Sequence, residues 1–513
     1  MILRIDTRSL LTVVAALIAL SVSTASADSS VYLREANAIL DKWIARKDVA
    51  TSLIADTDGK WTIRSTASRL YPALILTARL TNQDLYTGLL HETLADEMRL
   101  TSRLSVFPDD YHLKNQGFDR SSRNPQEILI NAATYAAGLA NIAAQVGPSP
   151  WTDRLKGIVD AAFLRADVQT DYAEGALPSD DLRVNGRLLK VLPLLAELYD
   201  DEGYLYYARR LGDAYCVSIL PKNGGLPAER WNFQDDKSRA PSLILEDAGV
   251  SFIEGMVGLY AVEARDSTAR ADIYRPTLSV MFDVLFDHGL KQNRRFYRRL
   301  QPDGKGGYSI DRKRESAHTA RVFLAAHHYG ILSGNATYSD RAIRALSEFS
   351  PESAWTALPA MIEFSGSSKD AASWVESVNL AKKDRNEDAG ERLVGLLAMA
   401  HRSAGGARIS PWRQDVSLTG SQSAMGLTLT VSATTPWVGK LVFPRQLHQA
   451  LFVGLGFPNG SRIDPDVAHR VENRTLGATA VWSGSLLVGG LSADIRQDLS
   501  ISVLPIPSAP TAP

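Results

Sequence analysis

The chain has 513 residues, of which 45% are hydrophobic and 22% are charged, a composition that excludes a largely disordered protein. Its formal net charge of −1 gives no indication of nucleic-acid or membrane-surface binding, and its single cysteine, Cys216, excludes an intramolecular disulfide framework and a cysteine-rich metal site. Because one hydrophobic core stops growing at roughly 250–300 residues, we expect at least two domains.

Residues 1–27 predict a secretory signal peptide. Arg4 and Arg8 make the start positive, an apolar run follows, and a small-residue triplet ends at Ala27. The apolar run is shorter than the about 20 residues that a membrane-spanning helix needs, which makes an uncleaved anchor the less favoured alternative. We therefore expect cleavage after Ala27 and a secreted or periplasmic protein.

The next region, to about Ala404, is rich in apolar residues at helical spacing. The predicted helices are Val31–Arg46, Arg64–Leu80, Asp84–Leu104, Pro125–Val146, Pro150–Arg165, Asp181–Tyr199, Tyr204–Leu220, Pro241–Ala264, Ala271–Phe286, Arg314–Leu332, Tyr338–Phe349, Glu352–Phe364 and Glu387–His401. Short polar turns join the two helices of a pair, while longer aromatic and charged segments separate the pairs. This alternation predicts a ring of helical hairpins with a functional mouth on the side of the long loops.

The pattern changes after Gly405-Gly406. Short alternating or β-branched runs follow, separated by Gly, Pro, Asn and Ser, and they predict a small antiparallel sheet or sandwich. The predicted strands are Asp415–Leu418, Gly426–Ser432, Val438–Phe443, Gly477–Trp482, Leu486–Val488 and Leu499–Val503. Residues 505–513 form a Pro/Ala/Ser tail that we expect to be disordered.

The segment Asn185–Tyr215 carries a resemblance to a known superfamily. It contains a helix, a polar turn and then Gly-x-x-x-Tyr-x-x-Ala in the next helix, and it resembles the hairpin repeated in (α/α)-toroid, or six-hairpin, carbohydrate-active enzymes. The resemblance implies a mainly α fold, with an (α/α) toroid at 28–404 followed by a small C-terminal antiparallel β domain at 405–504. It also implies a glycoside hydrolase or polysaccharide lyase with an oligo- or polysaccharide as its partner.

The predicted helix from Pro241 carries the first candidate site. Asp247, Ser251, Glu254 and Gly258 lie on one stripe of that helix at i, i+4, i+7 and i+11. Glycoside hydrolysis needs two carboxyl groups, one to protonate the leaving oxygen and one to activate water or attack carbon, and Asp247 and Glu254 suit these catalytic roles. The alternative is that Asp247 stabilises the helix start and that Glu254 lies on the surface.

Two loop segments supply further candidates. Ser179 or Asp180 suits capping of the following helix, which leaves Asp181 as a catalytic candidate and Asn185 as a substrate-binding one. In the next long loop, Glu229 and Trp231 combine a carboxylate with an aromatic ring, and such a pair suits a glycan subsite. A loop folded over its own aromatic residues explains that second pattern equally well.

A further pair, His318 and Arg321, favours a different reaction. An arginine can hold a uronate carboxylate, and a histidine can remove or return a proton, as a polysaccharide lyase requires. Tyr111 and His112, in the first long loop, are candidates to bind the substrate beside them, although the same stretch also suits a turn. His318 near a helix start has a structural alternative as well.

The first expectation is therefore an exported glycoside hydrolase. The alternatives are a polysaccharide lyase that acts by β-elimination on a uronic-acid-containing glycan, and a non-catalytic glycan-binding or scaffold protein on the same fold. The sequence has no phosphate-binding glycine loop, no HExxH and no dinucleotide fingerprint, so we expect no cofactor and no metal. We also expect no nucleic-acid partner and no membrane partner after cleavage. The oligomeric state, the sugar and the linkage stay open.

Overall fold

The computed structural model describes residues 28–56, 58–120, 122–347, 386–423, 426–443 and 463–506. The predicted signal peptide at 1–27 and the predicted helix Glu352–Phe364 lie outside these residues, as does the tail from residue 507. Among the described helices, none combines the length and the apolar character that crossing a bilayer demands.

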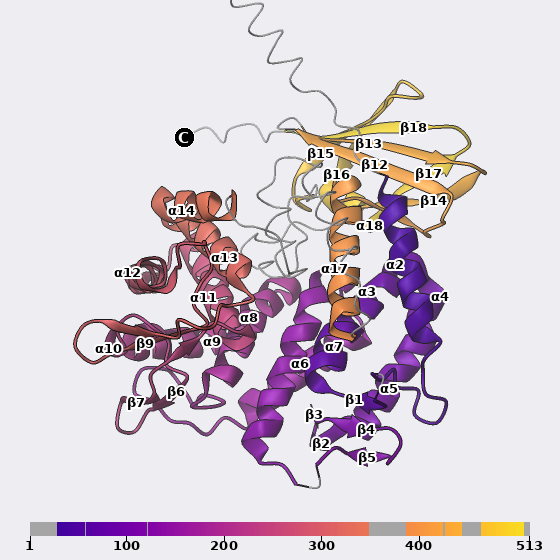
Figure 1. Cartoon of the computed structure of the whole chain (residues 1–513). Coiled ribbons are helices and arrows are strands. Elements are labelled where there is room, and N and C mark those ends of the chain that lie inside the picture. The colour runs from indigo at the N-terminus through magenta and orange to yellow at the C-terminus, as the bar shows by residue number, and fades with distance from the viewer. Residues whose placement is uncertain are drawn as a thin grey trace, which may run out of the picture.

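Most of the described helices alternate between an inner and an outer position (Figure 1). The inner ones are η1 (Ile63–Leu70) with α3 (Tyr71–Thr81), α6 (Pro125–Val146), α8 (Leu182–Tyr199), α11 (Asp247–Arg265), α13 (Thr319–Ser333) and α17 (Asn386–Ser403). The outer ones are α2 (Ser29–Ile44), α4 (Gln83–Thr87) with α5 (Leu89–Thr101), α7 (Pro150–Leu164), α9 (Glu202–Asp213) with η2 (Ala214–Ile219) and α10 (Leu220–Lys222), α12 (Ala269–Val284) with η3 (Leu285–Gly289), and α14 (Ala336–Ser347).

The inner helices follow one another in space in chain order, and α17 joins this series at its beginning. From η1 to α13 each inner helix packs against the next one, and α17 packs against both η1 and α3 at the beginning of the series. The buried faces agree with this arrangement, because α8, α11 and α13 bury most of their residues. The structure thus confirms the predicted fold class, an (α/α) toroid of helical hairpins.

Loop length separates the two ends of the toroid. Each inner helix from α3 to α13 ends in a short turn, such as the one at 200–201. The segments before η1, α6, α8, α11 and α13 are long, and all of them except the one before α8 carry short strands. The strands of these segments are β1 (Lys60–Trp61), β2 (Ser102–Leu104), β3 (Phe107–Pro108), β4 (Tyr111–His112), β5 (Gly117–Phe118), β6 (Arg230–Asn232), β7 (Lys237–Ala240), β8 (Leu243–Ile244), β9 (Arg299–Pro302) and β10 (Tyr308–Ile310). The first turns of the inner helices therefore gather at one end, which we call the mouth.

The C-terminal region has its own hydrophobic core and two antiparallel sheets. One sheet has the order β12-β13-β18-β15-β16 and the other has the order β11-β14-β17. Their strands are β11 (Arg408–Ser410), β12 (Val416–Ser423), β13 (Gly426–Ala433), β14 (Trp437–Val442), β15 (Ala468–Asn473), β16 (Ala478–Ser483), β17 (Leu491–Ile495) and β18 (Leu499–Pro505). Strand β12 packs against α2 and α17, and the Ser29 hydroxyl donates to the Leu418 carbonyl at 2.7 Å.

Three boundary predictions were wrong. The apolar run Leu486–Val488 lies in the short helix α18 (Gly484–Gly489), which Ser483 caps, because three apolar residues do not distinguish a strand from a helix. The helix predicted from Pro241 begins at Asp247, since the preceding residues pair as β8 with β9. The helix predicted from Arg314 begins at Thr319, because the Arg314 carbonyl accepts a hydrogen bond from the Arg298 amide.

Candidate functional site

The inner helices α8 and α11 approach each other closely beneath the mouth. A Cβ on Gly255 would come within 2.5 Å of the Lys190 amide nitrogen, and one on Gly186 within 2.8 Å of the Ala248 carbonyl oxygen. Only glycine fits these two positions without displacing backbone. The close contact places the polar stripes of α8 and α11 against each other.

Glu254 lies in this contact as a buried anion. Its side chain is 1% exposed, and Arg321 of α13 holds it in a bidentate pair, with Nε–Oε1 and Nη2–Oε2 both at 2.6 Å. The Lys190 ammonium of α8 lies 3.1 Å from the second oxygen, and burial lowers the pKa of Lys190 against the opposing attraction of Glu254. The alternative of a surface glutamate is therefore wrong, because both oxygens of Glu254 accept charge-assisted hydrogen bonds inside the protein.

Asp247 occupies the opening of the same cluster. Arg187 Nε of α8 lies 3.0 Å from one of its oxygens, and Arg321 Nη1 lies 3.2 Å from the other. Burial on its own raises the pKa of Asp247, but the charges of Arg187 and Arg321 outweigh it and hold the pKa well below its ordinary value. Because its side chain is still 38% exposed, Asp247 is an ionised carboxylate that faces the mouth.

His318 lies just before α13, at the N-cap position, and it is half-buried. Its Nδ1 lies 3.5 Å from Arg321 Nη1. Burial lowers the pKa of His318 to about 4, with a further contribution from the charge of Arg321 and an opposing one from Asp247. At neutral pH the imidazole is therefore uncharged and able to accept a proton.

The rim of the mouth adds further charges. Arg298, which precedes β9, donates from Nε to the Glu246 carboxylate at 2.5 Å, and this hydrogen bond is the main reason that the pKa of Glu246 is lowered. Arg64 of η1 contributes to the same lowering, so its charge reaches Glu246 from the first inner helix. Arg69, further along η1, contributes to the low pKa of His318.

The sequence prediction identified Asp247, Glu254, His318 and Arg321 but missed the cations of α8. The missing signal was present in the sequence, because Arg183, Arg187 and Lys190 lie at i, i+4 and i+7. This is the spacing of Asp247, Ser251 and Glu254 on the neighbouring helix. Two stripes of opposite charge with the same spacing indicate helices that face each other.

Asp181 and Asn185 have structural positions at the start of α8. Asp181 is fully buried and caps the helix by accepting from the Arg183 amide, and the Arg183 guanidinium binds both of its oxygens. Asn185 is also buried and donates to the Ser179 carbonyl at 2.7 Å. The prediction that Ser179 or Asp180 caps this helix was therefore wrong, since the cap is Asp181 itself.

The loop of Glu229 and Trp231 folds onto the start of α8. The Glu229 carbonyl accepts from the Leu182 amide at 2.9 Å, and the Trp231 amide donates to the Asp180 carbonyl at 3.0 Å. Trp231 is 2% exposed, so the expectation of an exposed aromatic ring for sugar stacking was wrong. The alternative interpretation, a loop folded over its own aromatic residues, describes it better.

Tyr111 and His112 form strand β4 between β1 and β5. Tyr111 is buried and packs edge-on against Phe118, with ring centroids 6.2 Å apart, while His112 is half-buried. Neither has a described hydrogen bond to the cluster around Arg321. The structure therefore places them in the first long loop, as predicted, but not beside His318.

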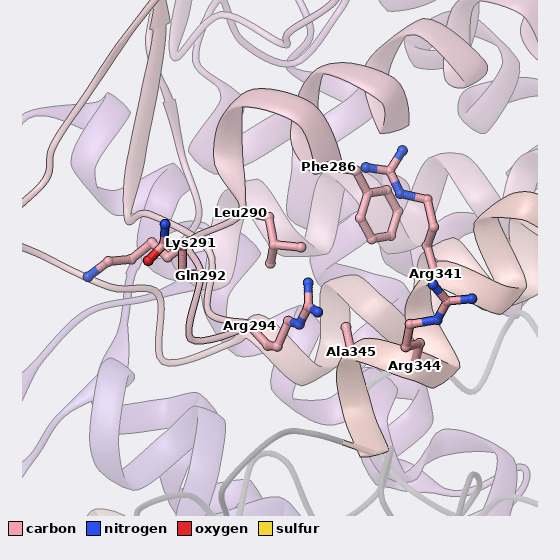
Figure 2. Close-up of a pocket in the computed structure, with 8 residues that line it drawn as sticks. All are labelled: Phe286, Leu290, Lys291, Gln292, Arg294, Arg341, Arg344 and Ala345. Atoms are coloured by element: carbon pink, nitrogen blue, oxygen red, sulfur yellow. The ribbon is translucent and has the colours of Figure 1, made fainter.

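A separate cavity of about 360 Å³ lies between η3 and α14 (Figure 2). Its lining residues are Phe286, Leu290, Lys291, Gln292, Arg294, Arg341, Arg344 and Ala345. The lining has four cations and no carboxylate, and it shares no residue with the cluster at α8, α11 and α13. Within the described ranges, no group of three His, Cys, Asp or Glu side chains is arranged to hold a metal ion.

Comparison with other proteins extends only to the fold. No protein-family model and no curated protein sequence matches the chain. A D-mannose isomerase aligns with 61% of this chain and 85% of its own, with a TM-score of 0.43 and 14% identity. The cellobiose 2-epimerase of Spirochaeta thermophila aligns with 72% and 96%, with a TM-score of 0.42 and 11% identity. The GH76A α-1,6-mannanase of Salegentibacter aligns with 55% and 78%, with a TM-score of 0.35 and 14% identity.

The ring of helical hairpins has the (α/α)-toroid architecture that the sequence resembles. The three aligned proteins are each named for a carbohydrate substrate, and their names cover isomerisation, epimerisation and hydrolysis. At TM-scores below 0.5 these likenesses carry no argument about the reaction of this chain.

Proposed function

We propose that this chain is an exported carbohydrate-active enzyme that removes a proton next to the carboxylate of a uronic-acid-containing glycan and cleaves the chain by β-elimination. The observation that supports it is the neutral His318 beside a cluster whose cations outnumber its carboxylates. Among the described residues, the carboxylates that pair with Arg187, Lys190 and Arg321 are Asp247 and Glu254, so an excess of positive charge remains at the mouth. Such an environment favours an anionic substrate and disfavours protonation of the histidine.

The carboxyl groups of the cluster are poorly suited to the acid step of hydrolysis. A glycoside hydrolase keeps one carboxyl protonated, usually by raising its pKa in an apolar environment. Here the pKa values of Asp247 and Glu246 are both lowered, and both oxygens of Glu254 accept hydrogen bonds from cations. Asp247 and Glu246 are therefore poor proton donors at neutral pH, and Glu254 has no oxygen free to face a leaving group, so the lyase alternative is favoured over the hydrolase expectation.

In the proposed step, the His318 imidazole takes the proton from the carbon next to the substrate carboxylate. The electron pair of that C–H bond forms a carbon–carbon double bond, the C–O bond to the leaving sugar breaks, and the leaving oxygen takes a proton from water or from the imidazolium. Arg321 cannot bind the substrate bidentately as predicted, because Glu254 and Asp247 occupy its guanidinium. Arg187 and the exposed Arg64 are better placed to hold the substrate carboxylate.

A panel of acidic and neutral glycans tests the proposal. A uronate substrate should give a new ultraviolet absorbance from the double bond, and His318→Gln should lower that rate by about 10²–10⁴-fold with wild-type folding. His327→Gln, on the same helix but hydrogen-bonded to Ser339 of α14, is the matched control and should retain the rate. New reducing ends without absorbance would instead support hydrolysis.

Hydrolysis remains the second candidate because of one observation, the exposed and ionised carboxylate of Asp247. Such a group is suited to activate a water molecule or to attack carbon. The two candidates differ in the residue on which turnover depends, which is His318 for elimination and Asp247 for hydrolysis.

A further inference from the structure

The segment between η3 and α13 has an unusual charge. Residues 291–314 contain nine Lys and Arg and only two Asp, in a chain whose totals are 56 basic and 57 acidic residues. The basic residues are Lys291, Arg294, Arg295, Arg298, Arg299, Lys305, Arg312, Lys313 and Arg314. We call this segment the basic loop. Because the whole chain is nearly neutral, the loop is a local feature and does not reflect an overall basic composition.

The basic loop forms an ordered hairpin at the mouth. Strands β9 and β10 pair with each other, and β9 also pairs with β8, which directly precedes Glu246 and α11. At the base of the hairpin, the Arg298 amide donates to the Arg314 carbonyl at 3.0 Å, and the Asp311 amide donates to the Arg299 carbonyl at 3.1 Å. The loop therefore passes Glu246 at Arg298 and ends four residues before His318.

The cations of the loop fall into two groups. Lys291 and Arg295 pair with Glu315, and Arg298 pairs with Glu246, so these three serve the local structure. A second group is exposed and has no carboxylate within ion-pair distance in the described part of the chain. It consists of Arg299, Lys305, Arg312, Lys313 and Arg314. The Arg299 guanidinium donates only to neutral groups, the Ser242 hydroxyl and the Gln301 amide.

Such a grouping is unfavourable for the folded chain alone. Exposed charges of one sign repel one another, whereas most arginines in the described part of the chain are paired with Asp or Glu, as at Arg183, Arg209 and Arg270. The same loop also supplies Arg294 to the basic cavity, where Figure 2 shows its side chain pointing toward α14, which carries Arg341 and Arg344. The exposed cations of the second group thus continue the positive charge of the mouth outward along one loop.

We propose that the basic loop is a secondary binding surface for an acidic polysaccharide, with Arg299, Arg312, Lys313 and Arg314 as the residues that contact its carboxylate or sulfate groups. This inference rests on the proposed function, which makes the ligand a glycan. It extends that ligand from a short substrate to a polymer. Regularly spaced anions of one polymer can contact the loop and the mouth together. Binding at two linked positions raises the effective affinity without new contacts in the mouth.

The test compares two triple variants of the full-length mature protein. The first, Arg312→Gln, Lys313→Gln and Arg314→Gln, removes three exposed cations of the loop. The second, Arg470→Gln, Arg474→Gln and Arg496→Gln, removes three exposed cations of the β-rich region as a matched control. The probes are polygalacturonate, heparin, a neutral xylan and a random DNA duplex, with dissociation constants measured between 50 and 200 mM salt as roughly the range in which counterion effects are large.

We expect the loop variant to bind polygalacturonate or heparin at least about tenfold more weakly at low salt, with a salt dependence shallower by roughly 2, as the loss of three counterion-releasing contacts predicts. The control variant and the neutral xylan should show no change. Wild-type affinity in the loop variant would overturn the inference. Equal binding of DNA, with the same loss in the loop variant, would also overturn it, because the surface would then be a general polyanion site.

The outcomes separate this inference from the proposed function. His318→Gln should lose turnover while it retains salt-sensitive binding to the acidic polymer. Binding that depends on the loop, in a protein without eliminase activity on any uronate, would contradict the proposed function and support the loop surface. Suppose instead that the protein has eliminase activity, but that the triple loop variant keeps the wild-type affinity and KM for the polymer. That result would support the proposed function and contradict the loop surface.

Discussion

Two buried carboxylate–arginine pairs, one at the mouth and one between outer helices, show how charge can be used in this fold. On the outer side, Glu97 of α5 and Arg154 of α7 form a bidentate pair with distances of 2.9 and 3.1 Å, and their side chains are 0% and 1% exposed. The remaining donor of Arg154 goes to the Val106 carbonyl. One cation meets one anion, and neither has contact with solvent.

The mouth cluster differs in charge balance and access. Glu254 is buried as deeply as Glu97, but it has two cationic partners, Arg321 and Lys190. Through Arg321 the cluster reaches Asp247, which solvent contacts, and His318, whose pKa is lowered. A buried pair of one cation and one anion is sufficient to join two helices. An excess of cations beside a neutral base is instead suited to binding an anion.

The largest expected effects fall on the two buried glutamates. Glu97→Gln and Glu254→Gln should each lower the free energy of unfolding by about 3–5 kcal/mol. The first removes the counter-charge of the buried Arg154, and the second removes that of Lys190 and leaves Arg321 with Asp247. Chemical denaturation measures both. A loss below about 1 kcal/mol in the Glu254 variant would mean that the mouth cations are already solvated, and it would contradict the burial of the Glu254 ion pairs.

His318→Gln should affect activity far more than stability. The expected rate loss of about 10²–10⁴-fold corresponds to about 3–5 kcal/mol of transition-state stabilisation, since tenfold in rate is about 1.4 kcal/mol. In the wild-type enzyme, kcat/KM should rise with pH through about 4, as the imidazole loses its proton, and then stay level toward neutrality. A rising limb centred near 6.5 would show that the base lies outside the cluster.

The same lowered pKa predicts a dependence of stability on pH. The unfolded histidine takes up a proton near pH 6.5, whereas the folded one does so only near pH 4. The contribution of His318 to stability is therefore present above about pH 6.5 and is lost as the pH falls toward 4. Unfolding curves of the wild type and of His318→Gln should converge or cross over this interval, and parallel curves would contradict the environment described for His318.

Gly255→Ala should have an intermediate effect on stability, because it separates α8 and α11, the two helices that meet beneath the mouth. A methyl group would lie 2.5 Å from the Lys190 amide nitrogen, so α8 and α11 must move apart, at a cost of about 1–3 kcal/mol. Activity should fall as well, because Arg187 and Lys190 move away from α11. Gly157→Ala, at a position on α7 with no atom within 4 Å of the added group, is the control.

Asp247→Asn should have the smallest effect on stability. The side chain is more than one third exposed, so its ion pairs are screened and we expect a change below about 1 kcal/mol. Elimination by His318 should survive this change within about tenfold, whereas hydrolysis that depends on Asp247 as its base should fall by 10² or more, following the usual contribution of about 10²–10⁴. The size of the loss therefore decides between the two reactions.

Much of the architecture could be predicted from local patterns. The helix Pro125–Val146 and the strands near Gly426 and Leu499 lie where the apolar spacing predicted them. Each element buries one face, and its apolar residues recur with the period of a helix or of a strand. The stripe of Asp247 and Glu254 was also visible. The starts of α11 and α13 were not, because the residues before them are held by strand pairing with a distant hairpin rather than by local propensity.

Sequence by itself determined the alternation of short turns and long loops, and with it the end of the toroid at which polar residues gather. Only the tertiary structure decided what those residues do. Whether Glu254 is exposed or buried, and whether Arg321 is available to a substrate, depend on the side chains that three different helices bring within hydrogen-bonding distance. Ionisation depends in the same way on tertiary neighbours, because Arg187 and Arg321 hold Asp247 ionised, and burial together with Arg321 keeps His318 neutral.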